Sequence, residues 1–415
     1  MHVTTSLNNK YFYSPRTNEI FLGDQECCDV NFHFKDFTPF QELPNVDQFI
    51  VNLTERCNLR CIYCCYSGAY EHHRSHSTSN LTDEGVDAVL TFIQNNAKKF
   101  PVCISFYGGE PLLKYQHLQD IILRSEKTWR ENVKFYIATN GVLLTSTRID
   151  WLVNHKVMIA VSIDGTAEIH NRQRITADGN GSYEKVYDAL SYIKNCYPDY
   201  IKDHVLLLTT IVSFDDIASL AEHWHQDSIL RDWVPTTLSS VAPNFATGES
   251  KVEWEEMKCK HESLLNLYDE HRDWVILKTY FDGCIKYWID RPVMDIGEEV
   301  PLSTCLPLTD KLFIDTHGNL HVCEKISGRF SIGNIYNGVD WEEANRLVKS
   351  YYDRRIQRCS HCPSIRLCSH CLTSVEFTEE QMDILCHNER IYTRLNFWLF
   401  CEMAERGLIQ TDSTD

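Results

Sequence analysis

Three closely spaced cysteines, Cys57, Cys61 and Cys64, are the first group of residues in this chain that could do chemistry. Cysteine thiolates are the usual ligands of iron–sulfur clusters, and this C-x3-C-x2-C spacing can ligate three irons of one 4Fe–4S cluster. The fourth iron then has no protein ligand, so a small molecule can bind there and be reduced. A zinc site and an accidental cysteine cluster are the alternatives. The apolar run Phe49–Leu53 predicts a strand whose following loop carries the cysteines.

A pair of glycines forms the second group. Gly108 and Gly109 precede Glu110 and follow the strand-like run Val102–Tyr107. Glycines let backbone groups come close to a ligand, and Glu110 offers an acceptor to a cationic amine. Taken alone, this segment predicts only a turn.

The C-terminal part of the chain is rich in cysteine. Seven cysteines lie there, at Cys305, Cys323, Cys359, Cys362, Cys368, Cys371 and Cys386. Because C-x2-C pairs bind zinc well, a pair of zinc ribbons is one interpretation. The whole chain has 18 cysteines and no evident secretion signal, which favours metal ligation over disulfides.

Taken in order, these groups resemble the radical S-adenosylmethionine (radical SAM) superfamily, in which the open iron chelates the methionine part of SAM. The resemblance covers roughly residues 48–390 and implies that the glycine segment binds the SAM amino group. In the family pattern, a serine and a later arginine hold the SAM carboxylate or ribose. A guanidinium suits a carboxylate because it binds both oxygens. The implied cofactor-binding residues are Tyr63, Gly108, Gly109, Glu110, Asn140, Ser162 and Arg174.

Some of these residues also have a plainer interpretation. Asp164-Gly165 could merely shape a turn, with Arg174 on the surface. Asn140-Gly141 could likewise be a structural turn that never reaches the SAM or substrate pocket.

The cysteine-rich segment resembles the SPASM extension of radical SAM enzymes, which holds two auxiliary iron–sulfur clusters. By this resemblance, the ligands of the distal cluster are Cys359, Cys362, Cys368 and Cys386. The ligands of the proximal cluster are Cys305, Cys323 and Cys371. Its fourth ligand is either Cys284 or absent, which would leave an open iron for a substrate thiolate. One departure is that two residues separate Cys368 from Cys371, where the family more often has three.

Glu324, directly after Cys323, is a candidate catalytic base. In the related anaerobic sulfatase-maturating enzymes an aspartate lies at that place. The alternative is a solvated carboxylate beside Lys325.

The segment that carries the first two groups alternates strand-like with helix-like runs. The predicted strands are Phe49–Leu53, Val102–Tyr107, Val133–Ala138, Val157–Ile163, Val205–Val212 and Val234–Leu238. The predicted helices between them are 83–98, 116–130, 146–155, 183–195 and 215–226. This alternation predicts an α/β fold, a partial (β/α)6 TIM-like barrel with a C-terminal cysteine-rich auxiliary iron–sulfur (SPASM) domain. Loops at the carboxyl ends of such strands carry the chemistry.

The chain of 415 residues is long enough for two or three domains. The expected parts are an N-terminal appendage (1–47) with a hairpin around 11–22, the barrel (48–250), bridging helices (251–304), the SPASM domain (305–390), and a C-terminal helix and tail (391–415).

The net charge of -18 disfavours a nucleic-acid partner, since phosphate contacts require basic patches. No apolar stretch approaches the roughly 20 residues that span a bilayer. We therefore expect no membrane partner and a cytoplasmic location.

The resemblance implies three 4Fe–4S clusters, SAM as cofactor, and a flavodoxin- or ferredoxin-type reductant. SPASM proteins mostly modify peptides, so the first hypothesis is a maturase that installs a thioether or carbon–carbon crosslink in a ribosomally made precursor peptide. The alternatives are an anaerobic sulfatase-type maturase that forms formylglycine, and a non-catalytic iron–sulfur electron carrier or redox sensor.

Overall fold

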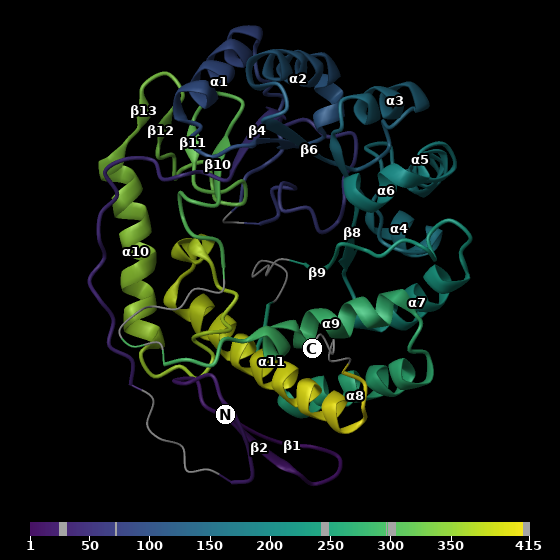
Figure 1. Cartoon of the computed structure of the whole chain (residues 1–415), viewed down its shortest axis with the longest axis vertical. Helices are drawn as coiled ribbons and strands as arrows, with labels where there is room; N and C mark the ends of the chain where they lie inside the picture. The colour runs from purple at the N-terminus through teal and green to yellow at the C-terminus, as the bar shows by residue number, and fades with distance from the viewer. Residues whose placement is uncertain (25–30, 71–72, 242–248, 296, 298–303, 410–415) are drawn as a thin grey trace. The chain divides into compact units, whose positions relative to one another are not determined.

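The structure, a computed structural model, describes residues 1–24, 31–70, 73–241, 249–295, 297 and 304–409 (Figure 1). These residues form two compact units. The sheet unit comprises Phe40–Thr247 and Leu306–Leu347, and the helical unit comprises Met1–Pro39, Gly248–Cys305 and Val348–Asp415. No helix among the described residues is long and apolar enough to cross a membrane.

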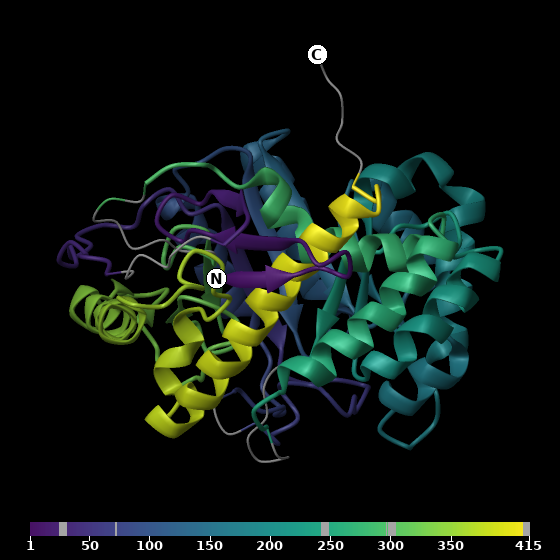
Figure 2. The same ribbon diagram turned by 90° about the horizontal axis from the view of Figure 1, so that it is seen from below.

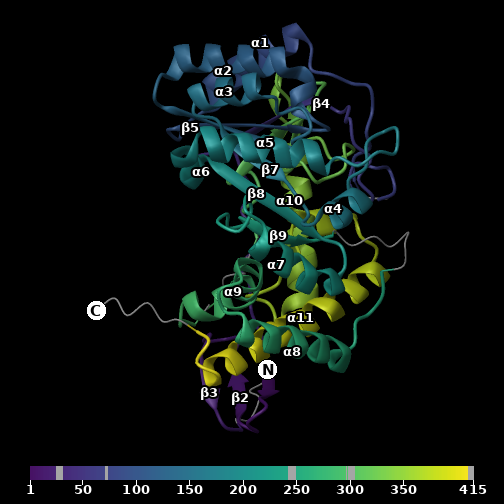
Figure 3. The ribbon, with the colours of Figure 1, turned by 90° about the vertical axis from the view of Figure 1, so that its right-hand side faces the viewer.

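The sheet unit is built on eight strands in the order β11-β10-β4-β5-β6-β7-β8-β9. All neighbouring pairs are parallel except β10 and β11, and Figure 3 shows the strands descending from β4 and β5 to β9. The strands predicted from the sequence are β4 (Gln48–Thr54), β5 (Val102–Gly108), β6 (Val133–Thr139), β7 (Met158–Ser162), β8 (Val205–Ile211) and β9 (Thr237–Ser240). The predicted α/β fold with a parallel sheet is therefore confirmed.

The last of these strands begins later than expected. The sequence predicted Val234–Leu238, but Val234 is exposed and Pro235 has no N–H to donate to a neighbouring strand. Pairing with β8 therefore starts at Thr237, opposite Leu208.

Helices on the outside of the sheet connect the parallel strands (Figure 1). They are α1 (Asp83–Asn96), α2 (Tyr115–Trp129), α3 (Ser146–Asn154), α4 (Ala167–Gln173), α5 (Tyr183–Cys196), α6 (Pro198–His204) and α7 (Ile217–Gln226). The predicted cap Thr82 accepts a hydrogen bond from the Gly85 N–H, and Val86, Val89 and Ile93 are buried at helical spacing. The sequence did not predict α4 and α6, because seven residues show too little periodicity.

Residues 306–347 add two strands to the same sheet. β10 (Lys311–Ile314) pairs in parallel with β4, with Phe313 opposite Ile50, and β11 (Leu320–His321) pairs with β10. A small hairpin of β12 (Gly333–Asn334) and β13 (Gly338–Val339) follows. The sequence placed these residues in a separate 305–390 segment, but three consecutive buried residues of β10 make them part of the sheet core. The five-part division of the chain stays a prediction.

The helical unit combines an N-terminal sheet with long helices. Its elements are β1 (His2–Thr4), β2 (Lys10–Tyr13), β3 (Ile20–Leu22), α8 (Trp254–Glu270), α9 (Val275–Asp290), the end of α10 (Trp341–Cys359) and α11 (Glu379–Glu405). The expected hairpin is confirmed by antiparallel pairing of β2 with β3, whereas β1 was not predicted. The expected C-terminal helix is the second half of α11, and tail residues 410–415 lie outside the described residues.

Aromatic side chains hold the helical unit together. The Trp288 ring centroid lies 5.0 Å from that of Tyr13 and 4.9 Å from that of Phe397. Figure 2 shows the purple N-terminal strands beside the yellow helix α11. There, the fully buried Glu402 accepts a hydrogen bond from the Ser6 hydroxyl at 2.9 Å.

Candidate functional site

The three N-terminal cysteines lie on the loop that follows β4, as predicted. The Cys64 N–H donates to the Cys61 carbonyl at 3.1 Å, which closes a tight turn. The Cys57 sulfur accepts the Leu59 N–H at 3.4 Å, and the Cys64 sulfur lies 3.6 Å from Nε2 of His76. The loop therefore gathers three thiols at the carboxyl end of a central strand.

The chemistry of these thiols fits a thiolate-held cluster. Burial raises the pKa of Cys57 and of Cys61 to about 11, and it also raises the pKa of Cys64. Buried thiols are inert as long as they stay neutral, whereas a bound cation would convert them to thiolates.

The donors are not arranged around a single point. Among the described residues, no three His, Cys, Asp or Glu side chains form a group that could hold a metal ion. A cubane cluster binds each cysteine through a different iron, so its ligands need not converge as those of a single zinc ion do.

The segment with the glycine pair forms backbone hydrogen bonds to the start of the cysteine loop. The Gly109 N–H donates to the Thr54 carbonyl at 2.8 Å, and the Glu110 N–H donates to the Arg56 carbonyl at 2.9 Å. A Cβ atom on Gly109 would come within 2.0 Å of the Arg56 carbonyl oxygen, and Gly108 has a φ of +130°. Only glycine permits this approach of two backbones.

Glu110 joins the ends of two strands. One carboxylate oxygen accepts the Thr139 hydroxyl at 2.8 Å and the Leu112 N–H at 3.0 Å, and the other accepts the Asn140 N–H at 2.8 Å. Complete burial raises its pKa to about 7. The sequence suggested that Glu110 accepts a cationic amine, but in the structure both oxygens already accept hydrogen bonds from the chain. That suggestion stays a prediction.

Asn140 reaches from the end of β6 to the cysteine loop. Its Nδ2 lies 2.8 Å from Oδ1 of Asn58 and 3.7 Å from the Cys57 sulfur. Its Oδ1 accepts the Val142 N–H at 3.1 Å. Asn140 therefore contacts the cysteine loop from within a turn, and its role at a SAM or substrate pocket stays a prediction.

Tyr63, Asp164 and Arg174 form a buried network at the other side of the loop. Asp164 accepts the Tyr63 hydroxyl at 2.5 Å, the Arg174 Nε–H at 2.7 Å and the Thr210 N–H at 2.9 Å. Burial alone would lower the pKa of Arg174, but Asp164 raises it well above its usual range. Burial raises the pKa of Tyr63. Both residues therefore keep their protons, and the guanidinium lies 5.3 Å from the centroid of the Tyr63 ring.

The sequence underestimated Asp164. It suggested only a turn there, with Arg174 on the surface as one alternative, but Asp164 is 1% exposed and Arg174 is 7% exposed. The signal available in the sequence was the position of an acidic residue just after a buried strand. Ser162, the predicted partner of Arg174, is half-buried at the end of β7.

Glu324 lies beside β10 and is not a solvated carboxylate beside Lys325. It is 8% exposed and forms an ion pair of 2.9 Å with Lys311, while the Cys323 thiol donates to it at 3.3 Å. Burial would raise the pKa of Glu324, but the charge of Lys311 and its hydrogen bond lower it overall. Tyr66 donates to the Glu324 carbonyl at 2.8 Å.

The distal group of C-terminal cysteines is in the helical unit. Cys359 ends α10, the Cys362 N–H donates to its carbonyl at 3.0 Å, and Cys386 lies on α11. Burial, with a smaller contribution from the nearby Cys362 and Cys386, raises the pKa of Cys359 to about 11, although the charge of Arg355 lowers it. Burial raises the pKa of Cys368 to about 12. Cys368 is buried and the other three are half-buried.

The other predicted ligands are divided between the units. Cys305 and Cys371 belong to the helical unit and Cys323 to the sheet unit, and their joint ligand set stays a prediction. Cys284 lies on α9, where burial raises its pKa to about 12 and Tyr280 is its hydrogen-bond partner.

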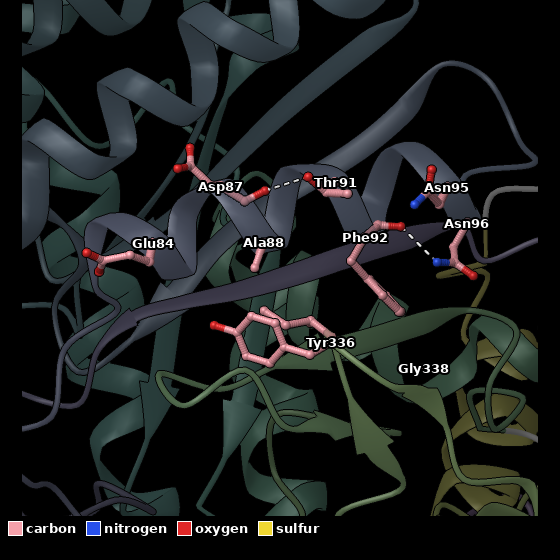
Figure 4. Close-up of a pocket in the computed structure, with 10 residues that line it drawn as sticks. Glu84, Asp87, Ala88, Thr91, Phe92, Asn95, Asn96, Tyr336 and Gly338 are labelled. Atoms are coloured by element: carbon pink, nitrogen blue, oxygen red, sulfur yellow. Dashed lines mark hydrogen bonds between the residues drawn. The ribbon is translucent and has the colours of Figure 1, made fainter.

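A groove of about 580 Å³ lies elsewhere on the sheet unit, between α1 and the β12–β13 hairpin (Figure 4). Phe92 and Tyr336 face each other across it. None of the residues that line it is a predicted site residue. Thr91 and Asn96 donate to the backbone of α1 itself, and Glu84, Asp87 and Asn95 add further polar side chains to the lining.

Comparison with known proteins agrees with this geometry. The family described as the radical SAM superfamily matches residues 51–221. A cysteine-type anaerobic sulfatase-maturating enzyme of Clostridium perfringens (strain 13 / Type A) is 21% identical over 374 residues, which cover 86% of this chain and 97% of that protein. The radical SAM cyclopropyl synthase TigE of Paramaledivibacter caminithermalis is 23% identical and covers 77% of this chain and 65% of its own length.

Two solved structures share the fold. The structure of a histidine-tagged anSMEcpe with bound AdoMet has a TM-score of 0.63 and 18% identity, and covers 88% of this chain and 96% of that chain. Native anSMEcpe with bound AdoMet and Kp18Cys peptide has a TM-score of 0.61 at 18% identity, and covers 86% of this chain and 97% of that one.

We predict that Glu110→Gln lowers the free energy of unfolding by about 1–3 kcal/mol, because the new amide nitrogen cannot accept the Asn140 N–H. The effect should depend on pH. The folded-state pKa of Glu110 is raised from 4.5 to about 7, so the folded wild type binds this proton more tightly than the unfolded chain. Wild-type stability therefore falls as pH rises through that window. Urea unfolding at pH 5 and pH 8 should show a larger loss for the variant at pH 5.

The matched control is Glu131→Gln, which changes an exposed glutamate. It should leave the free energy of unfolding at pH 5 and at pH 8 within about 0.5 kcal/mol of wild type. An equal loss for Glu110→Gln at both pH values would show that this carboxyl does not titrate in the window.

Proposed function

We propose that this chain, whose residues 51–221 match the radical SAM superfamily, is an enzyme that matures a peptide or protein by oxidising a Cys or Ser side chain to formylglycine. The observation that carries this choice is the buried carboxylate of Glu324, at the place where the sulfatase-type maturases have an aspartate. The similarity to a sulfatase-maturating enzyme along 97% of its length supports the same choice.

A ribosomal-peptide maturase that forms a thioether or carbon–carbon crosslink is the second candidate. The similarity to a cyclopropyl synthase, a radical SAM enzyme with a different product, favours it. Both candidates need a peptide to enter the site, and one of the similar structures contains a peptide together with AdoMet.

We propose the same cofactor-binding residues that the resemblance implies. Cys57, Cys61 and Cys64 would hold the first 4Fe–4S cluster through three thiolates. The residues proposed around SAM are Tyr63, Gly108, Gly109, Glu110, Asn140, Ser162 and Arg174. When bound, the clusters and SAM supply electron transfer and the abstraction of a hydrogen from the substrate.

The C-terminal cysteines complete the proposed cofactor set as a SPASM extension. Cys359, Cys362, Cys368 and Cys386 would hold a distal auxiliary cluster, and Cys305, Cys323 and Cys371 a proximal one. A flavodoxin- or ferredoxin-type reductant and a cytoplasmic location belong to the same proposal, which includes no nucleic acid and no membrane partner.

Glu324 is the proposed general base. Its carboxylate would accept the proton of the substrate thiol or hydroxyl when the carbon–sulfur or carbon–oxygen double bond forms. The ion pair with Lys311 keeps Glu324 ionised before the reaction and balances its charge in a buried setting.

We predict that Cys57→Ala, Cys61→Ala and Cys64→Ala each abolish the formation of 5′-deoxyadenosine from SAM with dithionite as reductant. Each change removes one of three thiolates that the cluster requires. Cys65→Ala is the matched control, since it removes a neighbouring thiol outside the ligand spacing whose pKa burial also raises. Loss of activity in Cys65→Ala with retention in Cys64→Ala would overturn the ligand assignment.

We predict about twelve irons per chain after anaerobic reconstitution, as three 4Fe–4S clusters require. Cys359→Ala or Cys368→Ala should lower this content by about four irons. Cleavage of SAM should persist in these variants, because it depends on the first cluster only, whereas peptide modification should be lost.

Iron, 5′-deoxyadenosine and product mass should be measured on the same soluble preparation, because loss of a cluster also removes folding energy. A stable content near four irons together with stoichiometric zinc would remove the auxiliary clusters from the proposal.

We predict that Glu324→Gln slows product formation by about 10²–10⁴-fold, because the general base is lost, while SAM cleavage continues. Glu324→Asp should retain part of the activity. The measurement is the product mass from a peptide with one Cys and from its Ser counterpart. Conversion to an aldehyde supports the sulfatase-type reaction, and a crosslinked product that lacks two hydrogens supports the second candidate. Full activity of Glu324→Gln would exclude Glu324 as the base.

A further inference from the structure

The side chain of Asn140 is held in one orientation. Its Oδ1 accepts the Val142 N–H at 3.1 Å, and its Nδ2 donates to Oδ1 of Asn58 at 2.8 Å. These two contacts fix which end of the amide is the donor, because an inverted amide would place like groups together in both. The second N–H of the amide is then available to the Cys57 sulfur, 3.7 Å from Nδ2.

The backbone around Asn140 is held as firmly as its side chain. The Asn140 N–H donates to the buried carboxylate of Glu110 at 2.8 Å, and the Gly141 N–H donates to the Thr139 hydroxyl at 3.1 Å. Asn140 itself is 8% exposed, so water competes little for its amide. A hydrogen bond from this amide to sulfur is therefore already formed when a cluster binds, and it lies in a low-dielectric setting where its electrostatic effect is large.

Cys57 differs from Cys64 in having a side-chain amide as a donor. Its sulfur accepts the Leu59 N–H at 3.4 Å in addition to the Asn140 amide. The neighbours of the Cys64 sulfur are the backbone N–H of Tyr66 and the ring of His76. The amide itself does not titrate in the working pH range.

We propose that Asn140 is a positioning residue that raises the reduction potential of the cluster held by Cys57, Cys61 and Cys64, by donating an N–H···S hydrogen bond to Cys57. This inference rests on the proposed function, in which these cysteines are cluster ligands. Reduction adds one electron and hence negative charge to a thiolate-held cluster. A donor directed at a ligand sulfur stabilises the reduced form more than the oxidised form, and hydrogen bonds to sulfur are among the factors that set cluster potentials.

The test compares Asn140→Leu with wild type. Leucine has a similar size and no charge, so the variant removes the donor without adding an electrostatic change. The midpoint potential is measured by redox titration of the reconstituted holoenzyme without SAM. The relevant cluster is identified as the one whose electron paramagnetic resonance signal changes when SAM is added. We expect a more negative potential, with the reduced fraction at a fixed poise about tenfold lower, which corresponds to about 59 mV for one electron.

The matched control is Asn58→Ala. It removes the other partner of the Asn140 amide and leaves the contact with Cys57 in place. Its potential should stay at the wild-type value or rise, because the amide can turn more fully to sulfur. A negative shift in Asn58→Ala as large as that in Asn140→Leu would overturn the proposal, since loop placement alone would then explain both. An unchanged potential in an Asn140→Leu variant with full iron content would also overturn it.

Should Asn140→Leu fail to retain iron, Asn140→Asp takes its place, because an aspartate can still accept the Val142 N–H. The new carboxylate oxygen replaces a donor with a negative charge near sulfur, so the potential should again become more negative. An unchanged potential would overturn the proposal here too. Failure of the proposed function gives a different result, namely a wild-type chain that holds no SAM-sensitive cluster, or a SAM-sensitive cluster that persists in the Cys57→Ala variant.

Discussion

The backbone contact between the glycine turn after β5 and the loop after β4 is the constraint on which the rest of the site depends. Gly109 and Glu110 donate their N–H groups to the carbonyls of Thr54 and Arg56, directly before Cys57. A side chain at Gly109 would occupy the space of the Arg56 carbonyl. This contact fixes where the cysteine loop leaves the sheet. Asn140, Asp164 and Arg174, which follow β6, β7 and α4, contact the loop relative to that starting point.

Two buried carboxylates connect the ends of neighbouring strands near the cysteine loop. Glu110 connects the ends of β5 and β6, and Asp164 connects the cysteine loop with Arg174 and with Thr210 on β8. A buried carboxylate is costly unless hydrogen bonds satisfy it, so each of these positions demands several donors in a fixed arrangement. The two residues therefore hold adjacent strand ends in register with the loop.

The sequence predicted the parallel strands and the longer helices because their apolar residues recur with a clear period, as at Val86, Val89 and Ile93. It also predicted that the three cysteines lie on a loop after a strand, because the apolar run Phe49–Leu53 precedes them. It missed α10, although Ala344, Leu347, Val348 and Tyr351 are buried there at helical spacing. Charged residues are frequent along this helix and obscure its apolar pattern. The roles of Asp164, Lys311 and Asn58 could not be predicted, since each depends on a partner distant in the sequence.

The pairing of β10 with β4 has a consequence for how the site is assembled during synthesis. β4 lies between β5 and β10, and these two neighbours come from opposite ends of the sheet unit's sequence. As the chain leaves the ribosome from its N-terminus, β4 and β5 can pair early, but one side of β4 stays an open edge until residues 311–314 emerge. Unpaired edges invite contact with other chains. The strand that carries Lys311, the ion-pair partner of Glu324, thus also covers the open edge of β4, so one late event both protects that edge and forms the ion pair.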